Sequence, residues 1–222
     1  MKKSILIFLL CISGIAGTAQ KLQWDSTFRP GNYVLKVSQF RSYPNSDKDI
    51  IFLGNSITDY TDWNELLQLK EARNRGISGD ITFGILERLD EVIEGKPAKV
   101  IILIGINDIA RNIPDSVIIK NYLTIIHRIK AASPKTKIYF NTLFPVNNSF
   151  PAKNHFNKDD HIAFVNDAIR NLAISEKIKV IDIHPHLLDA DKKLDKKYTY
   201  DGLHLNNEGY LKWAEVIKPY LD

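Results

Sequence analysis

Short runs of consecutive apolar residues recur along the chain, separated by longer segments with helical spacing of apolar and polar residues. Four runs are strong and one is weaker; they cover residues 50–53, 72–76 (the weaker run), 100–104, 138–140 and 180–183. Runs of this length are typical of strands in a parallel sheet that is buried on both faces. The pattern therefore predicts five parallel strands.

Apolar residues at every third or fourth position predict helices in the segments that separate and follow these runs. These segments cover residues 81–93, 115–133, 162–172 and 210–221. Asp80 and Asn206 stand where the N-caps of the first and last of these helices are expected. Alternating strands and helices predict an α/β fold: three αβα layers around a doubly wound, five-stranded parallel sheet of the flavodoxin-like kind.

The first residues have the pattern of a targeting segment. Lys2 and Lys3 precede an apolar run over residues 5–12, and small residues follow up to Ala19. This order is that of a secretory signal peptide, so we predict a signal over residues 1–19 and an exported protein, periplasmic or secreted. The apolar run is too short for a permanent membrane span, so none is expected after cleavage.

A single domain is expected over residues 20–222, because the chain of 222 residues, 44% hydrophobic and 25% charged, suits one packed core. Within it, residues 20–48 are expected to form an N-terminal packing arm with a short helix after Gly31. The formal net charge is +4, without a dense basic block, which argues against a nucleic-acid partner. The only cysteine, Cys11, excludes a disulfide framework and any cysteine-based zinc site. His184 and His186 could suggest a metal pair, but a solvated loop is the favoured interpretation, so no metal is expected.

Polar and glycine-rich segments follow three of the predicted strands, and a fourth precedes the last helix. They cover residues 54–58, 76–80, 105–108 and 201–204. In an open parallel sheet, ligands bind at the carboxyl ends of the strands. We therefore expect these four segments to converge on one rim of the sheet.

Together the four segments contain the parts of an acyl-transfer site. Ser56 is the predicted nucleophile and needs a base, which His204 supplies. Asp201, three residues earlier, can hold the imidazole in the required tautomer. The backbone N–H groups of Ser56 and Gly79 and the side-chain amide of Asn107 are the predicted oxyanion-hole donors.

Four further residues are candidates for substrate binding. Tyr60 and Trp63 follow the nucleophile, and either could belong to the core of the first helix or face the substrate. His155 and Phe156 lie in the irregular segment 143–158, and a loop of that length is usually functional or mobile. Substrate contact therefore stays one of two interpretations for each.

The four segments resemble the conserved blocks of the SGNH (GDSL-type) esterases and acylhydrolases. The family's Ser, Gly, Asn and His fall on Ser56, Gly79, Asn107 and His204, and its Asp falls on Asp201. Residues 74–82 and 203–210 resemble most the branch with platelet-activating-factor acetylhydrolase subunits and carbohydrate (sialate) O-acetylesterases. The resemblance implies a serine esterase that forms an acyl-enzyme and needs no cofactor. One residue departs from the family pattern, because Asn55 replaces the usual Asp and puts the bonding of the nucleophile turn in question.

These observations favour an exported serine esterase that removes short acyl groups, acetyl above all, from alcohol oxygens. A small-molecule or glycan ester is the expected partner, and carbohydrate O-acetyl esters are the favoured substrates. Two alternatives stay open: a lysophospholipase or other lipid acylhydrolase of the same family, and a non-catalytic glycan-binding module on this fold. A nucleotide-binding domain is disfavoured, since no Gly-x-Gly-x-x-Gly follows the first strand.

Overall fold

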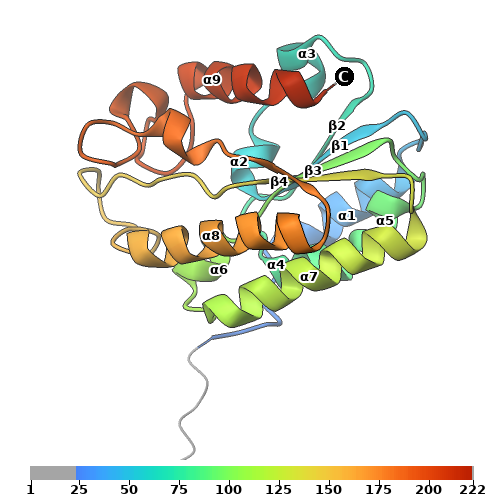
Figure 1. Cartoon of the computed structure of the whole chain (residues 1–222), viewed down its shortest axis with the longest axis horizontal. Coiled ribbons are helices and arrows are strands. Elements are labelled where there is room, and N and C mark those ends of the chain that lie inside the picture. Colours follow the sequence, from blue (N-terminus) through green and yellow to red (C-terminus); the bar gives the residue numbers. More distant parts are fainter. Residues whose placement is uncertain (1–23, 222) are drawn as a thin grey trace, which may run out of the picture.

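A five-stranded, all-parallel sheet forms the centre of the computed structural model, which describes residues 24–221 (Figure 1). The strand order is β2-β1-β3-β4-β5. The strands are β1 (Ile50–Gly54), β2 (Ala72–Gly76), β3 (Lys99–Leu103), β4 (Lys137–Asn141) and β5 (Lys179–Ile181). The predicted doubly wound fold is confirmed. The predicted signal peptide, residues 1–19, lies outside the described residues.

Helices cover both faces of the sheet. In Figure 1, α3 (Trp63–Leu67) and α9 (Asn207–Ile217) lie above the sheet. The layer below it holds α1 (Tyr33–Ser42), α4 (Thr82–Glu87), α5 (Leu89–Ile93), α6 (Ile106–Ala110), α7 (Asp115–Ala132) and α8 (Asp159–Ser175). The remaining elements are α2 (Ser56–Asp59) and the 3-10 turns η1 (His184–Leu187), η2 (Lys196–Tyr198) and η3 (Lys218–Tyr220). Between residues 24 and 221, no helix has both the length and the hydrophobicity needed to cross a membrane.

Aromatic side chains fill the layer between the sheet and α9. Trp63 stacks on Phe52 of β1 with ring centroids 3.9 Å apart, and Trp213 of α9 meets its edge at 4.6 Å. The indole N–H of Trp63 donates to the Thr58 carbonyl, so its one polar atom is satisfied inside the core. Trp63 is thus a core residue that fixes α2 and α3 against β1.

The helix predicted over residues 81–93 is wrong in one respect, because the chain forms two short helices, α4 and α5, that meet at Arg88. Asp80 also does not cap the first of them through its carboxylate. One carboxylate oxygen accepts from the Ile81 N–H and the other from Arg88, whereas the cap position falls on Ile81. By contrast, Asn206 caps α9 as predicted, because its side chain accepts from the Gly209 N–H.

The guanidinium of Arg88 is fully buried and ties four segments together. It donates to the Asp80 carboxylate at 3.0 Å and to the Glu91 carboxylate at 3.2 Å. Its remaining nitrogen reaches the backbone carbonyls of Gly54 at 3.3 Å and Arg75 at 2.9 Å, near the ends of β1 and β2. A planar group with five donors suits such a junction better than a lysine.

Replacing Arg88 with Met is expected to lower the free energy of unfolding by about 3–5 kcal/mol, because the Asp80 and Glu91 carboxylates would remain buried without this partner. Urea denaturation of the two proteins measures the difference. Arg41→Met is the matched control, since Arg41 and Asp90 form an exposed ion pair whose loss costs about 0–1 kcal/mol. Equal losses in the two variants would contradict the assignment.

Candidate active site

The nucleophile candidate lies at a tight turn between β1 and α2. Asn55 is the N-cap of α2, and its side-chain oxygen accepts from the Ile57 N–H at 3.0 Å. The turn requires glycine at residue 54, because a Cβ there would lie 2.2 Å from the Thr58 hydroxyl and 2.3 Å from the Leu103 carbonyl. Ser56 thus begins a helix directly at the carboxyl end of β1.

The three predicted catalytic side chains form one hydrogen-bonded chain. Ser56 Oγ lies 3.0 Å from His204 Nε2, and His204 Nδ1 lies 2.8 Å from Asp201 Oδ2. An ionised carboxylate only accepts hydrogen bonds, so the proton of the neutral imidazole sits on Nδ1. The lone pair of Nε2 therefore faces the serine hydroxyl, as the abstraction of its proton requires.

The loop that carries Asp201 and His204 is closed by its own hydrogen bonds. Asp201 Oδ1 accepts from the backbone N–H groups of Leu203 at 3.0 Å and His204 at 2.8 Å. The buried hydroxyl of Thr199 donates to the His204 carbonyl and accepts from the Gly202 N–H. The sequence analysis did not identify Thr199, although a hydroxyl two residues before the Asp was a usable signal for a closed turn.

The carboxyl group of Asp201 has a lowered pKa. Burial acts to raise this pKa, but hydrogen bonds from the His204 ring and from the backbone of His204 and Leu203 lower it to about 2. Lys153 adds a positive charge, with Nζ 3.3 Å from Asp201 Oδ2. Asp201 is therefore ionised at neutral pH, which supports the imidazole tautomer inferred above.

The oxyanion-hole candidates come from segments that the structure locks together. The Ile77 N–H donates to the Gly54 carbonyl, which holds the segment of Gly79 beside the nucleophile turn. The Asn107 amide donates to the Asp80 carbonyl at 2.9 Å, one residue from Gly79. Gly79 has φ +83°, which an L side chain rarely adopts, so its N–H depends on glycine for its direction. The predicted convergence of these segments is thus present.

His155 contacts a predicted oxyanion-hole residue, Asn107, and does not lie free in a loop. Its Nε2 is 2.9 Å from Asn107 Oδ1, so Nε2 carries the proton and donates, while the amide nitrogen of Asn107 stays directed at the Asp80 carbonyl. Burial, followed by the nearby charge of His204, lowers the pKa of His155 to about 4. A neutral His155 therefore fixes the orientation of the Asn107 amide, which the loop sequence did not indicate.

The other substrate-binding candidates lie either at the rim of the site or in the hydrophobic core. Tyr60 is half exposed, and its ring lies 5.2 Å from the His204 ring. Trp63 and Phe156 are 1% and 6% exposed and belong to the hydrophobic core. For these two the core interpretation holds, because packing against distant segments leaves no ring surface for a substrate.

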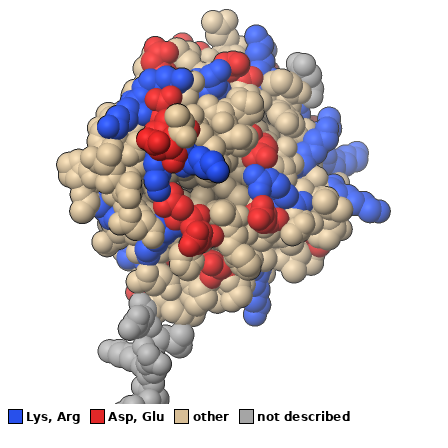
Figure 2. Space-filling view, turned by 60° about the vertical axis from the view of Figure 1, so that its left-hand side comes forward, with Lys and Arg blue, Asp and Glu red and all other residues tan. Residues whose placement is uncertain are grey.

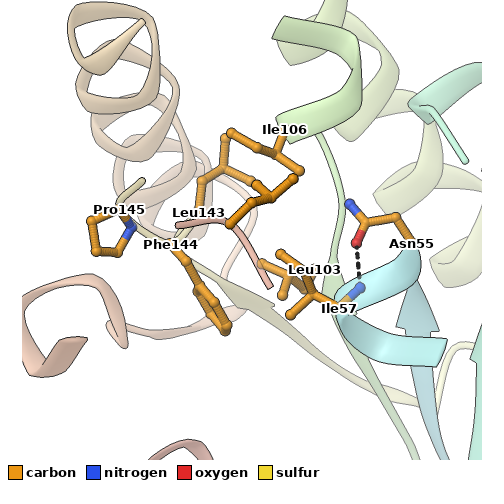
Figure 3. Close-up of a pocket in the computed structure, with 8 residues that line it drawn as sticks. Asn55, Ile57, Leu103, Ile106, Leu143, Phe144 and Pro145 are labelled. Carbon is orange, nitrogen blue, oxygen red and sulfur yellow. Dashed lines mark hydrogen bonds between the residues drawn. The ribbon is translucent and has the colours of Figure 1, made fainter. Parts of the chain in front are cut away.

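A small apolar cavity lies behind the nucleophile turn (Figure 3). Its volume is about 10 Å³, and Asn55, Ile57, Leu103, Ile106, Leu143, Phe144, Pro145 and Leu203 line it. That volume suits about one water-sized group. The Asn55 amide nitrogen is buried and has no hydrogen-bond partner within residues 24–221. Asn55, where the resemblance expects Asp, thus keeps the hydrogen bond that caps α2. Its amide nitrogen is left without a partner among the described residues.

Charges of both signs are interspersed over the side of the molecule that includes the loops after β4 and β5. Figure 2 brings this side, the left of Figure 1, forward; Lys and Arg lie among Asp and Glu and do not form a field of one sign. A ligand that binds on this side would therefore be selected by direct contacts and not by long-range electrostatic attraction.

Comparisons with known proteins agree with this geometry. The model of the GDSL-like lipase/acylhydrolase family matches residues 52–212. N-acylneuraminate cytidylyltransferase of Escherichia coli is 30% identical over 193 residues, which are 82% of this chain and 43% of that protein. The chain thus spans less than half of that relative.

Platelet-activating factor acetylhydrolase IB subunit alpha2 of Rattus norvegicus is 27% identical over 183 residues, 78% of this chain and 74% of that protein. Among solved structures, one from Streptococcus pneumonia, described as a candidate platelet activating factor, has a TM-score of 0.80 and 29% identity. The match covers 86% of this chain and 93% of that one.

His155→Gln is expected to flatten the dependence of folding stability on pH between about pH 4 and 6.5. In that window the unfolded chain binds a proton at His155 that the folded chain does not, so stability falls as the pH falls. Glutamine keeps a donor for Asn107 but does not titrate. Urea unfolding at pH 7 and pH 4.5 measures the change.

The control for this experiment is His186→Gln, which removes an exposed histidine. If His155→Gln and the wild type lost the same free energy of unfolding between the two pH values, the inferred protonation state of His155 would be wrong.

Proposed function

The chain belongs to the GDSL-like lipase/acylhydrolase family and is an ester hydrolase, and on that premise we propose that it removes acetyl groups from carbohydrate hydroxyls through a Ser56–His204–Asp201 triad. The observation that carries the proposal is the hydrogen-bonded chain from Ser56 Oγ to His204 at 3.0 Å and on to Asp201 at 2.8 Å. A nucleophile, a base and an orienting carboxylate in this order are the parts of covalent acyl transfer.

In the proposed reaction, Ser56 Oγ attacks the ester carbonyl carbon while His204 Nε2 takes the hydroxyl proton. The negative oxygen of the tetrahedral intermediate accepts from the N–H groups of Ser56 and Gly79 and from the Asn107 amide. When the intermediate collapses, the bond to the alcohol oxygen breaks and His204 returns the proton to that oxygen. Acetyl-Ser56 and the free alcohol result.

Water then attacks the acetyl-enzyme, with His204 again taking the proton. Collapse of the second intermediate releases acetate and returns the proton to Ser56 Oγ. Asp201 stays ionised throughout and stabilises the imidazolium that forms twice in each cycle. Every step uses water and this chain's own side chains and backbone N–H groups, so the proposal needs no cofactor.

Two observations support an acetyl group and a sugar. The relative from Rattus norvegicus that is 27% identical is named a platelet-activating factor acetylhydrolase. The relative that is 30% identical has a name that refers to N-acylneuraminate, a sugar acid. Export, predicted from residues 1–19, would place the enzyme with extracytoplasmic glycans and is part of the same proposal.

Ser56→Ala is expected to lower the hydrolysis of p-nitrophenyl acetate by more than about a thousandfold, because the nucleophile is lost while the fold is kept. Steady-state rates measure the effect. Ser42→Ala, which removes an exposed hydroxyl on α1, is the matched control and should retain the wild-type rate.

The same assay over acyl chains of two to twelve carbons tests the acetyl assignment. A preference for chains of eight carbons or more would overturn it in favour of a lipid acylhydrolase. Glycan binding without turnover, unchanged in Ser56→Ala, would instead indicate a non-catalytic binding module.

A further inference from the structure

Two exposed tyrosine rings lie beside the imidazole of His204. The Tyr60 ring centroid is 5.2 Å from that of His204, and the Tyr200 ring lies 6.0 Å away and within 13° of parallel. Tyr60 is 50% exposed and Tyr200 57% exposed. Two aromatic rings that flank a candidate catalytic base offer a contact surface to a ligand bound there.

Both rings are held by the elements that carry the triad. Tyr60 follows Ser56 by one helical turn; its N–H donates to the Ser56 carbonyl, and its hydroxyl lies 3.0 Å from Ser78 Oγ. Tyr200 directly precedes Asp201, in the loop that the Thr199 hydroxyl closes. Neither ring needs a loop movement to reach its place, so little ordering is required when a ligand binds.

The position of the rings decides which half of the ester they contact. His204 delivers a proton to the oxygen of the departing alcohol, so that oxygen must lie next to Nε2 in the productive complex. Groups that flank the imidazole therefore face the alcohol. The acyl carbonyl is directed instead toward the donors of Ser56, Gly79 and Asn107.

We propose that Tyr60 and Tyr200 bind the alcohol half of the ester and that this half is a sugar ring, an inference that rests on the proposed function. The C–H face of a pyranose packs on an aromatic ring, and the phenol hydroxyls at the ring tips can bond to sugar hydroxyls. Tyrosine supplies both in one rigid side chain. The two rings thus form a specificity surface beside the catalytic base.

Aromatic faces also bind quaternary ammonium ions such as choline. The Asp201 carboxylate, next to Tyr200 in the sequence, is already paired with the Lys153 ammonium at 3.3 Å and with the His204 ring at 2.8 Å, so it offers such a cation little attraction. A neutral sugar needs no counter-charge and is the favoured ligand, and binding of a quaternary ammonium is an outcome of the test.

The test compares three acetyl esters: an O-acetylated methyl pyranoside, ethyl acetate, whose alcohol has no ring, and acetylcholine. Tyr60→Ala and Tyr200→Ala are each expected to lower kcat/KM for the pyranoside about tenfold more than for ethyl acetate, because only the pyranoside loses the stacked face. Tyr60→Phe and Tyr200→Phe, which keep the ring, should retain most of the preference. Tyr43→Ala, which removes an exposed ring beyond α1, is the control.

Two results would overturn the inference. One is an equal loss on the pyranoside and on ethyl acetate, which would make the rings structural. The other is a wild-type preference for acetylcholine that the Ala variants abolish, which would assign the surface to a quaternary ammonium.

A wild-type protein that hydrolyses none of the three esters would contradict the proposed function and not the binding surface. In that case, saturation-transfer NMR with the acetylated pyranoside decides the inference on its own. Binding to Ser56→Ala that is lost when Tyr200→Ala is added would support it. Binding that is unaffected by the second substitution would overturn it.

Discussion

The placement of Arg88 is the constraint on which the arrangement of the rim depends. Its guanidinium joins the carbonyl ends of β1 and β2 to the Asp80 carboxylate, so the nucleophile turn and the Gly79 segment cannot move independently. The Asp80 carbonyl in turn orients the Asn107 amide. A buried ion pair of this kind adds little net stability over a hydrophobic packing of the same volume. Its value here is positional, because it fixes the relative places of the backbone donors that the proposed mechanism directs at one oxygen.

Much of the fold and of the candidate site's placement could be predicted from the sequence, because both rest on local signals. Buried strands appear as continuous apolar runs, and parallel topology brings the segments of Ser56, Asn107 and His204 to one edge without any knowledge of side-chain contacts. What could not be predicted depends on pairs far apart in the chain. The division between α4 and α5 coincides with the buried contacts of Arg88, and Trp63 is a core residue because β1 and α9 enclose it. The role of His155 arises from a contact with a residue 48 positions away.

The candidate site has two parts: one that resembles the family pattern and one that is particular to this chain. In the proposed mechanism, the donors around Ser56, Gly79 and Asn107 serve the acyl carbonyl, whose chemistry is the same in every ester, and they fall on the segments that resemble the family's blocks. In the proposed reaction, the surface beside His204 faces the alcohol, which differs between substrates, and Tyr60 and Tyr200 form it. The rim would therefore combine a reaction common to all esters with selection of one alcohol. Only the selection requires residues outside these segments.

The asparagine at residue 55 has a consequence for how the cap of the nucleophile helix responds to pH. An aspartate, which the resemblance to the family would put at this place, has a carboxylate that can take up a proton in acid and then accepts hydrogen bonds less well. The Asn55 amide carries the same cap bond to Ile57 but does not titrate. The chain tolerates one unpaired buried donor, at a cost on the order of 1–3 kcal/mol, and in return the hydrogen bond that caps the nucleophile helix does not depend on proton concentration.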